Sequence, residues 1–232
     1  MALEAYTRSG TDVVRELQSS RNEGLSAKEV AKRLNRYGKN EFVQKKKKSF
    51  LRRFFEQFED FMILVLIAAA FISFAASMIE GNTDFTDPVI ILAIVILNAI
   101  LGVAQEEKAE KSLEALKKIS APTAIVYRDG MRAEIAAGKL VPGDIIEVEA
   151  GGYVPADARL LESVQLKVDE SALTGESLPV KKSADKVFTE GTLLAERTNM
   201  IYSTSIVTNG HALAVVTETG MHTEVGKIAD MI

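Results

Sequence analysis

Residues 168–180 of this chain read VDESALTGESLPV, a predicted β-strand that runs into a loop. Around the start of the stretch, Val164, Leu166 and Val168 alternate strictly with polar residues, a period typical of a half-buried strand. A glycine and Pro179 then interrupt the regular pattern. The stretch therefore predicts a β domain that presents a loop at the end of one of its strands.

The loop carries a carboxylate at its tip. Thr174 and Ser177 can hold the loop through side-chain to backbone hydrogen bonds, and Gly175 permits a positive φ. Glu176 would then project toward a group outside the domain, in a geometry that suits a docking carboxylate. Taken alone, four such residues form a solvated turn more often than a catalytic loop, so both interpretations remain open.

Short β-rich segments separated by turn signals lie on both sides of this stretch. These segments are residues 123–127, 131–135, 144–149, 200–208 and 212–217. Asp129-Gly130 and Asn209-Gly210 each lie between two segments, and such pairs are strong signals for β-hairpins. We therefore expect residues 121–232 to form a compact sandwich or jelly-roll-like barrel.

Two apolar runs precede the β domain. Residues 61–79 contain no charge and would span roughly 28 Å as a helix, close to the thickness of the hydrocarbon core of a bilayer. Residues 88–104 are interrupted only by Asn98 as a strongly polar side chain. Two buried helices of a soluble protein are the alternative to a transmembrane hairpin. The predicted segments are a transmembrane helix at 56–80, an extracytoplasmic loop at 81–87, and a second transmembrane helix with its cytosolic stalk at 88–120.

The charges that flank the apolar runs predict their orientation. Basic residues precede the first run and follow the second, and they are Lys45, Lys46, Lys47, Lys48, Arg52, Arg53, Lys108 and Lys111. The loop between the runs carries Glu80, Asp84 and Asp87 and has no basic residue. The positive-inside rule then places both long ends of the chain in the cytosol. The run of four lysines is either a solvated anchor or a site for anionic lipid.

Residues 1–55 are predicted to be a cytosolic helical segment. Ser26 and Glu29 form a capping box that begins a helix over residues 26–37, and an earlier helix is expected around residues 11–19. This polar segment lacks the apolar core of a cleaved signal peptide. At the other end, a helix from Thr223 has no stop signal, which suggests that the natural polypeptide continues.

Composition excludes several classes of function. A formal net charge of −4 offers no concentrated basic face for nucleic acid, so we expect no nucleic-acid partner. The absence of cysteine excludes disulfides, thiolate metal sites and cysteine nucleophiles. His211 and His222 lie outside any pattern of metal ligands, and we expect structural or surface roles for them and no metal site in this chain.

The loop resembles the signature of a known family. Thr174-Gly175-Glu176-Ser177 is similar to the signature loop of the actuator domain of P-type ATPases. Two upstream segments agree with the signatures of that domain and occur in the family's order, VPGDI at residues 141–145 and VPADARL at residues 154–160. The resemblance covers the chain nearly from end to end. It implies a membrane α+β protein with two transmembrane helices, N-terminal helices and a cytosolic β jelly-roll-like actuator domain.

The resemblance assigns roles to the loop. In such pumps an aspartate on a separate domain takes the γ-phosphoryl group of Mg-ATP, and the actuator glutamate positions the water that hydrolyses the aspartyl phosphate. Glu176 is the matching residue, Thr174 and Gly175 would shape the approach to the phosphoryl group, and Ser177 would brace the loop. These four residues are the predicted catalytic set.

The family's phosphorylated Asp-Lys-Thr-Gly segment is missing from this sequence, as is any nucleotide-binding glycine-rich loop. Magnesium and ATP would therefore bind to the phosphorylation and nucleotide-binding domains of a longer polypeptide, and this fragment should be inactive alone. Those domains, the remaining transmembrane helices and the lipid bilayer are its expected partners.

Two segments favour calcium as the transported ion. QFED at residues 57–60 resembles the same position in sarcoplasmic-reticulum-type calcium pumps, where the glutamate, here Glu59, lines the ion entry gate. An acidic cap at a membrane interface is the alternative for these residues. NAILGV at residues 98–103, followed by Gln105-Glu106, also resembles the second helix of calcium pumps.

Two other functions remain open, a P-type pump for protons, sodium or potassium, and a membrane-tethered β module that only binds partners. As part of a pump for calcium or for another cation, the chain would be a multi-pass integral membrane protein, in the plasma membrane if the organism is a bacterium.

Overall fold

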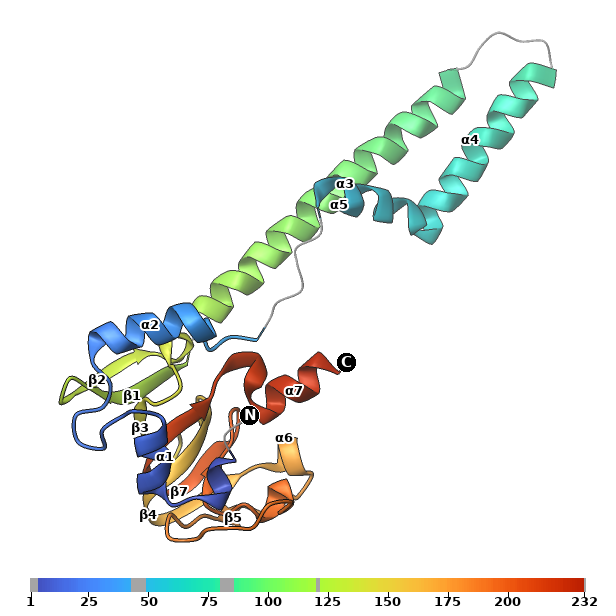
Figure 1. Ribbon diagram of the computed structural model, residues 1–232. Helices are drawn as coiled ribbons and strands as arrows, with labels where there is room; N and C mark the ends of the chain where they lie inside the picture. Colours follow the sequence, from blue (N-terminus) through green and yellow to red (C-terminus); the bar gives the residue numbers. More distant parts are fainter. Residues whose placement is uncertain (1–3, 43–48, 80–85, 120–121, 232) are drawn as a thin grey trace. The chain divides into compact units, whose positions relative to one another are not determined.

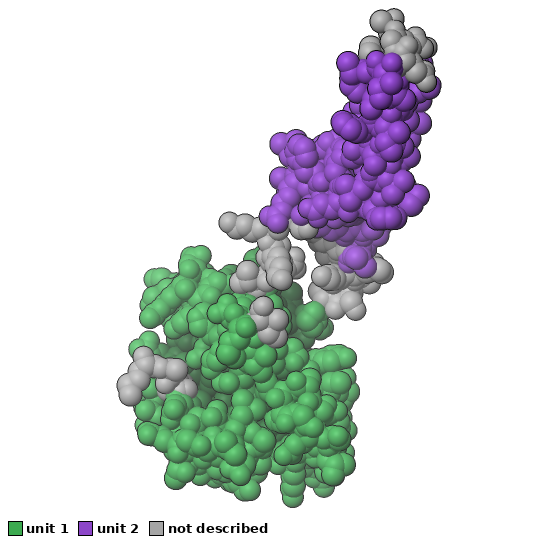
Figure 2. Space-filling view, turned by 90° about the vertical axis from the view of Figure 1, so that its right-hand side faces the viewer, with its two compact units in different colours: residues 1–44, 121–232 green, residues 45–120 purple. Residues whose placement is uncertain are grey.

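The computed structural model describes residues 4–42, 49–79, 86–119 and 122–231 of the 232-residue chain. The chain forms two compact units, Met1–Gln44 together with Ala121–Ile232, and Lys45–Ser120. They are coloured green and purple in Figure 2. The run of four lysines at 45–48 and the loop acids Glu80 and Asp84 lie outside the described residues.

One antiparallel sheet forms the centre of the first unit (Figure 1). Its strands are β1 (Thr123–Arg128), β2 (Met131–Ala136), β3 (Ile145–Glu149), β4 (Asp157–Asp169), β5 (Val180–Lys181), β6 (Met200–Ile201) and β7 (Ile206–Glu218). The strand order is β2-β1-β3-β7-β4-β5, and β6 also pairs with β4. The predicted β domain is therefore present as a sheet in which every strand pairing is antiparallel.

Short helices surround the sheet. They are η1 (Ala5–Thr7), α1 (Gly10–Glu16), α2 (Ala27–Tyr37), η3 (Ala137–Lys139), α6 (Ser171–Thr174), η4 (Leu194–Glu196), η5 (Gly220–His222) and α7 (Glu224–Asp230). The Ser26 side chain caps α2 by accepting from the Glu29 N–H at 3.3 Å, and Gly38 ends the helix with φ 78°. This confirms the predicted helix over residues 26–37. The expected earlier helix exists as α1 and ends at Glu16.

Neighbouring residues of the central strands point to opposite faces of the sheet, so the unit has two hydrophobic cores. Ile146 of β3 and Ala214 of β7 belong to the larger core. Ile145 and Val215, each one position away, belong to a second core that includes Val13 of α1. The N-terminal helices therefore cover a face of the sheet that would otherwise be apolar and exposed.

The predicted hairpin at Asn209-Gly210 is wrong, although the one at Asp129-Gly130 is confirmed. β7 runs without reversal through Asn209 and Gly210, because β4 pairs with it both before and after this point, while β3 pairs with residues 211–215. Between the pairs Val164–His211 and Lys167–Asn209, two residues of β4 face only Gly210. This is a β-bulge in β4, where Gln165 has φ 49°, and Gly210 of β7 faces it with φ +76°.

The second unit contains two long helices and a short helical segment that precedes the first of them at a bend. Its elements are α3 (Phe50–Glu56), η2 (Gln57–Glu59), α4 (Phe61–Ile79) and α5 (Thr86–Ile119). α5 is one continuous helix, as expected for a span that extends into a stalk. α3 is tied to it by an ion pair of 2.6 Å between Arg53 Nη2 and Glu110 Oε2.

One described helix, over Thr86–Leu113, is long and apolar enough to cross a membrane. A second crossing is reached only if Phe50–Glu59 and Phe61–Ala76, bent by 74°, count as a single span. The predicted transmembrane segment covers residues 56–80, whereas α4 covers Phe61–Ile79, the apolar run itself. Asp60 causes this difference, because its backbone is extended and its carboxylate accepts from the Met62 N–H at 2.8 Å as a helix cap.

Candidate active site

The predicted loop at residues 174–177 connects β4 and β5. These strands form an antiparallel ladder in which Val168 faces Val180. The backbone N–H of Lys182 donates to the carbonyl oxygen of Leu166 at 3.0 Å and extends the ladder by one step. The two ends of the loop are therefore held side by side at the edge of the sheet.

The Thr174 hydroxyl organises the backbone of the loop. Its Oγ1 donates to the carbonyl oxygen of Glu170 at 3.1 Å and accepts from the backbone N–H of Glu176 at 3.3 Å. Between these contacts, Gly175 ends α6 in a left-handed conformation with φ 77° and ψ −2°. The Glu176 side chain is exposed. The structure thus combines a backbone held by Thr174 with a carboxylate that is free to meet a group outside the domain.

The residues after Glu176 leave the sheet surface. Ser177, Leu178 and Pro179 are all exposed, and Leu178 is 80% exposed. The Ser177 hydroxyl forms no hydrogen bond with any described residue, in contrast to Thr174. The bracing role expected of Ser177 therefore has no contact in this arrangement and stays a prediction.

A buried ion pair lies at the base of the loop. Lys182 Nζ lies 2.6 Å from Glu170 Oε1, and both side chains have an exposed fraction of 0%. The distance is that of an ion pair, although its angles fall short of good hydrogen-bond geometry. No other described residue hydrogen bonds to the ammonium or to the carboxylate. The Tyr202 ring covers the ammonium, with its centroid 5.5 Å from Nζ.

The environment shifts the pKa values of both partners toward their neutral forms. Burial raises the pKa of Glu170, against the opposing charge of Lys182, and the charge of Glu176 raises it further. Burial likewise lowers the pKa of Lys182, against the opposing charge of Glu170. The 2.6 Å contact opposes both shifts, because each charged partner stabilises the other.

Sequence reasoning missed this pair, although a signal for it exists. Leu166 and Val168 are buried, and the same alternation places Glu170 on the inward face at the next step. On the returning strand, Lys182 is inward two positions after Val180. Two charged residues in inward positions at opposite ends of one loop predict an ion pair.

The upstream signature VPGDI maintains the sheet framework. Asp144 is fully buried and accepts two hydrogen bonds from Arg128, at 2.8 Å from Nε and 2.6 Å from Nη2. It also accepts from the backbone N–H of Val141 at 2.8 Å. The bidentate pair joins the end of β1 to the turn before β3.

The signature VPADARL also has a structural role. The Asp157 carboxylate accepts from the backbone N–H of Ser203 at 2.8 Å and of Glu224 at 2.7 Å, and its burial raises the pKa to about 7. Arg159 is buried and donates to the carbonyl oxygens of Arg8 at 3.0 Å and of Lys186 at 2.9 Å. Both side chains therefore join segments that are distant in sequence.

Glu59, predicted to lie on an ion pathway, is in η2 and is exposed. The cap of α4 comes from Asp60, which accepts from the N–H groups of Met62 and Ile63. The acidic-cap interpretation therefore applies to Asp60. Glu59 lies one position earlier, before the helix begins.

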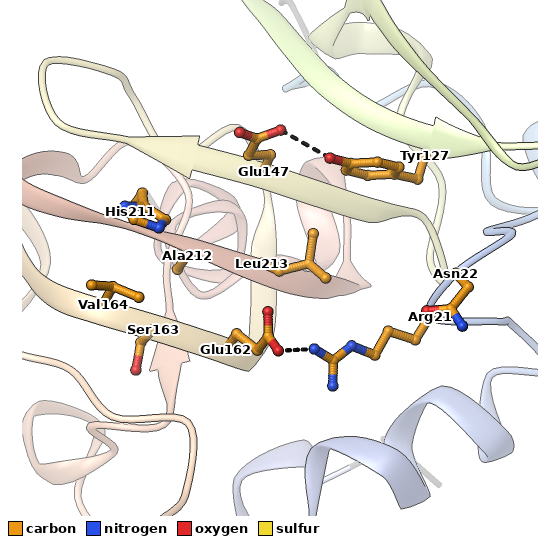
Figure 3. Close-up of a pocket in the computed structure, with 10 residues that line it drawn as sticks. All are labelled: Arg21, Asn22, Tyr127, Glu147, Glu162, Ser163, Val164, His211, Ala212 and Leu213. Atoms are coloured by element: carbon orange, nitrogen blue, oxygen red, sulfur yellow. Dashed lines mark hydrogen bonds and ion pairs between the residues drawn. The ribbon is translucent and has the colours of Figure 1, made fainter.

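A separate cavity of about 400 Å³ opens on the sheet, away from the loop in sequence and in its lining residues (Figure 3). Its charged groups are already paired, since Arg21 contacts Glu162 and the Tyr127 hydroxyl donates to Glu147 at 3.2 Å. His211 also lines it. Among the described residues, no group of three or more His, Asp or Glu side chains is placed to hold a metal ion. The loop is therefore the better candidate for chemistry.

Comparisons with known proteins place the loop inside a known domain. Residues 118–232 match the family model of the P-type ATPase actuator domain, and residues 5–73 match that of the cation transporter/ATPase N-terminus. The chain is 46% identical over 96% of its length to a "Calcium-transporting ATPase" of Bacillus subtilis. It is 42% identical over 98% of its length to "Calcium-transporting ATPase 1" of Bacillus cereus.

A plant protein is similar as well. The chain is 39% identical over its whole length to "Calcium-transporting ATPase 2, endoplasmic reticulum-type" of Arabidopsis thaliana. The aligned regions cover 24%, 25% and 23% of the three relatives, in the order given. The chain therefore spans about a quarter of the length of the curated relatives it matches.

Proposed function

Because this chain belongs to the P-type ATPase family and contains its actuator domain, we propose that it is the N-terminal part of an ATP-driven calcium pump. The names of the bacterial and plant relatives support calcium, in preference to protons, sodium or potassium, as the cargo. Since the chain spans only a quarter of those relatives, the rest of the pump would come from further domains of the same polypeptide.

In this proposal Glu176 promotes hydrolysis of an aspartyl phosphate carried by another domain. Water attack on an acyl phosphate needs an oriented nucleophile and a proton acceptor within hydrogen-bond reach. The geometry of Glu176 carries the proposal, because its carboxylate is exposed while its backbone N–H is held by Thr174. A Cβ atom added at the neighbouring Gly175 would meet no heavy atom within 4 Å, so the tip is open to an approaching group.

The neighbouring residues suit a loop that docks. Leu178, two positions beyond Glu176, is largely exposed and so is accessible to a docking domain. The partners proposed are the phosphorylation and nucleotide-binding domains, which would bind magnesium and ATP. This chain's own contribution is the carboxylate and the loop that presents it.

We also propose that the second unit crosses the bilayer twice, through α5 and through α4, with α3 and η2 on the cytosolic side of the bend before α4. Basic residues flank the two apolar runs on one side only, which supports placing both ends of the chain in the cytosol. Glu59 would lie at the cytosolic entrance to the first span, on the path of calcium. Asp60 caps α4, so Glu59 is not needed as a cap.

The test uses the full-length pump with Glu176→Gln, which keeps the side chain's shape and removes its basicity. Phosphoenzyme should form from ATP as in the wild type but break down about a hundredfold more slowly, because a general base contributes on that order. The matched control is Glu134→Gln, at an exposed glutamate of β2. Unchanged breakdown in the Glu176 variant would show that this carboxylate does not act on the phosphoryl group.

Calcium is tested separately, by ATP-dependent uptake into sealed vesicles that contain the full-length protein. We expect calcium to accumulate and to be required for phosphoenzyme formation. Phosphoenzyme that responds to sodium, potassium or protons and not to calcium would refute the assignment of cargo. A protein that forms no phosphoenzyme with any cation would instead be a membrane-tethered binding module.

A further inference from the structure

The two ends of the loop that carries Glu176 meet at the buried pair of Glu170 and Lys182. Glu170 immediately precedes α6, and Lys182 immediately follows β5. Their 2.6 Å contact therefore encloses the whole loop between two charged side chains with no solvent exposure. The pair sits where a small displacement of either strand end would move the loop.

Stability does not explain this pair well. Burying two charges carries a desolvation penalty of several kcal/mol per ion, which mutual attraction offsets only when further hydrogen bonds satisfy both groups. Here no other described residue hydrogen bonds to the ammonium or the carboxylate. Two apolar residues of similar volume would stabilise such a site at least as well. The role of the pair is therefore geometric, because it fixes the positions of the groups attached to it.

A chain of contacts leads from the pair to Glu176. The carbonyl oxygen of Glu170 accepts from the backbone N–H groups of Leu173 and Thr174, each at 2.9 Å. It also accepts from the Thr174 hydroxyl at 3.1 Å, and that hydroxyl accepts from the N–H of Glu176. A change in the position of Glu170 is therefore transmitted through Thr174 to the backbone of Glu176.

We propose that Glu170 and Lys182 are positioning residues for Glu176, and that their ion pair sets the rate at which the phosphoenzyme breaks down. The inference rests on the proposed function of Glu176 and extends it to two residues that never touch the phosphoryl group. Lys182 holds the carboxylate of Glu170, Glu170 holds Thr174, and Thr174 holds the backbone of Glu176. The ring of Tyr202 keeps water from the ammonium and so preserves the strength of the pair.

The experiment compares Lys182→Met and Glu170→Gln in the full-length pump. Each should form phosphoenzyme from ATP at the wild-type level and slow its breakdown roughly tenfold to a hundredfold, as small misplacements of catalytic groups do. Lys181→Met is the matched control, because Lys181 is the exposed neighbour on β5 and contacts neither member of the pair. Its breakdown rate should equal that of the wild type.

A second measurement separates positioning from a general loss of structure. If Lys182 acts through Glu176, adding Lys182→Met to Glu176→Gln should cause no further slowing of breakdown, because the group being positioned is already disabled. Full additivity of the two effects would overturn the proposal. So would wild-type breakdown in Lys182→Met. If instead Glu176→Gln alone has no effect, the proposed function itself fails, which is a distinct result.

Removal of one charge leaves the other buried without a partner, and such a change can prevent a single variant from folding. The double variant Glu170→Gln/Lys182→Met buries no charge and should form phosphoenzyme normally while breaking it down slowly. Normal breakdown in this double variant would overturn the proposal. Failure of the double variant to form phosphoenzyme would show that the pair serves the fold alone, which would also overturn it.

Discussion

Replacement of Gly210 by alanine separates the bulge seen in the structure from the hairpin that the sequence predicts. In the bulge, a Cβ atom at Gly210 would lie 2.2 Å from the carbonyl oxygen of Val164 and 2.6 Å from the carbonyl carbon of Gln165. Both contacts are with backbone atoms, so no side-chain rotation relieves them. In an open two-residue turn, the same methyl group would point into solvent.

The magnitude follows from two contributions. A non-glycine residue at φ +76° costs about 1–2 kcal/mol in backbone strain. Forcing the methyl group against β4 adds about 1–3 kcal/mol, the usual range for overpacking a tight site. We therefore expect Gly210→Ala to lower the free energy of unfolding of the sheet by about 2–5 kcal/mol.

Gly130→Ala is the matched control for the strain alone. Gly130 has φ +71° but no heavy atom within 4 Å of a Cβ position, so its variant should lose only about 1–2 kcal/mol. The assay is hydrogen exchange of the β7 amides by mass spectrometry, on the chain in detergent micelles. A difference of about 1–3 kcal/mol between the two variants corresponds to exchange about five to a hundred and fifty times faster in Gly210→Ala. Equal exchange in both variants would refute the bulge.

Two further predictions concern other side chains. Burial raises the pKa of Asp157 from its ordinary 3.8 to about 7, so its contribution to stability is complete below pH 4 and is lost as the pH rises through 7. Asp157→Asn should reduce this loss of stability, which amounts to at most about 4 kcal/mol between pH 4 and 8. Thermal unfolding over this pH range measures the loss, and an unchanged pH dependence in the variant would contradict the assignment. In the full-length pump, Thr174→Val should slow phosphoenzyme breakdown about two- to tenfold by removing a hydroxyl worth about 0.5–1.5 kcal/mol, whereas Thr174→Ser should not. Equal rates in those two variants would show that the hydroxyl is dispensable.

Local signals predicted the elements whose structure is decided within a few residues. The capping box of Ser26 and Glu29 predicted α2, and Asp129-Gly130 predicted the turn between β1 and β2, since cap and turn geometry depend on neighbouring backbone groups alone. The continuous α5 was also expected from its apolar run and the stalk predicted to follow it. These predictions needed no knowledge of distant partners.

The signals that failed depend on what lies across the sheet. Asn209-Gly210 has the composition of a hairpin turn, and only the pairing of β7 with β3 and β4 keeps it within a continuous strand, opposite a bulge in β4. In the predicted segment at 56–80, the apolar run does not by itself mark the helix boundary at Asp60. The outcome there depends on whether the Asp60 carboxylate is used as a cap.

The sequence predicted the residues at the tip of the loop but not the ion pair at its base. The composition of the loop identifies Thr174 and Glu176, because hydroxyl and carboxylate groups are visible in the sequence. The pairing of Glu170 with Lys182 requires the register that brings β4 and β5 together, and twelve positions separate the two in sequence. The bracing role expected of Ser177 remains a prediction.

The discontinuity of the first unit also determines the order in which the protein can be completed during synthesis. Asn199 donates from its side-chain amide to the carbonyl oxygen of Tyr6 at 2.9 Å, across 193 positions of the chain. At a translation rate of about 5–20 residues per second, Tyr6 waits roughly 10–40 s for that partner to be made. α4 and α5, which pack against each other, are synthesised within this interval. The two helices are therefore complete first, and the N-terminal residues of the chain are among the last to form their native contacts.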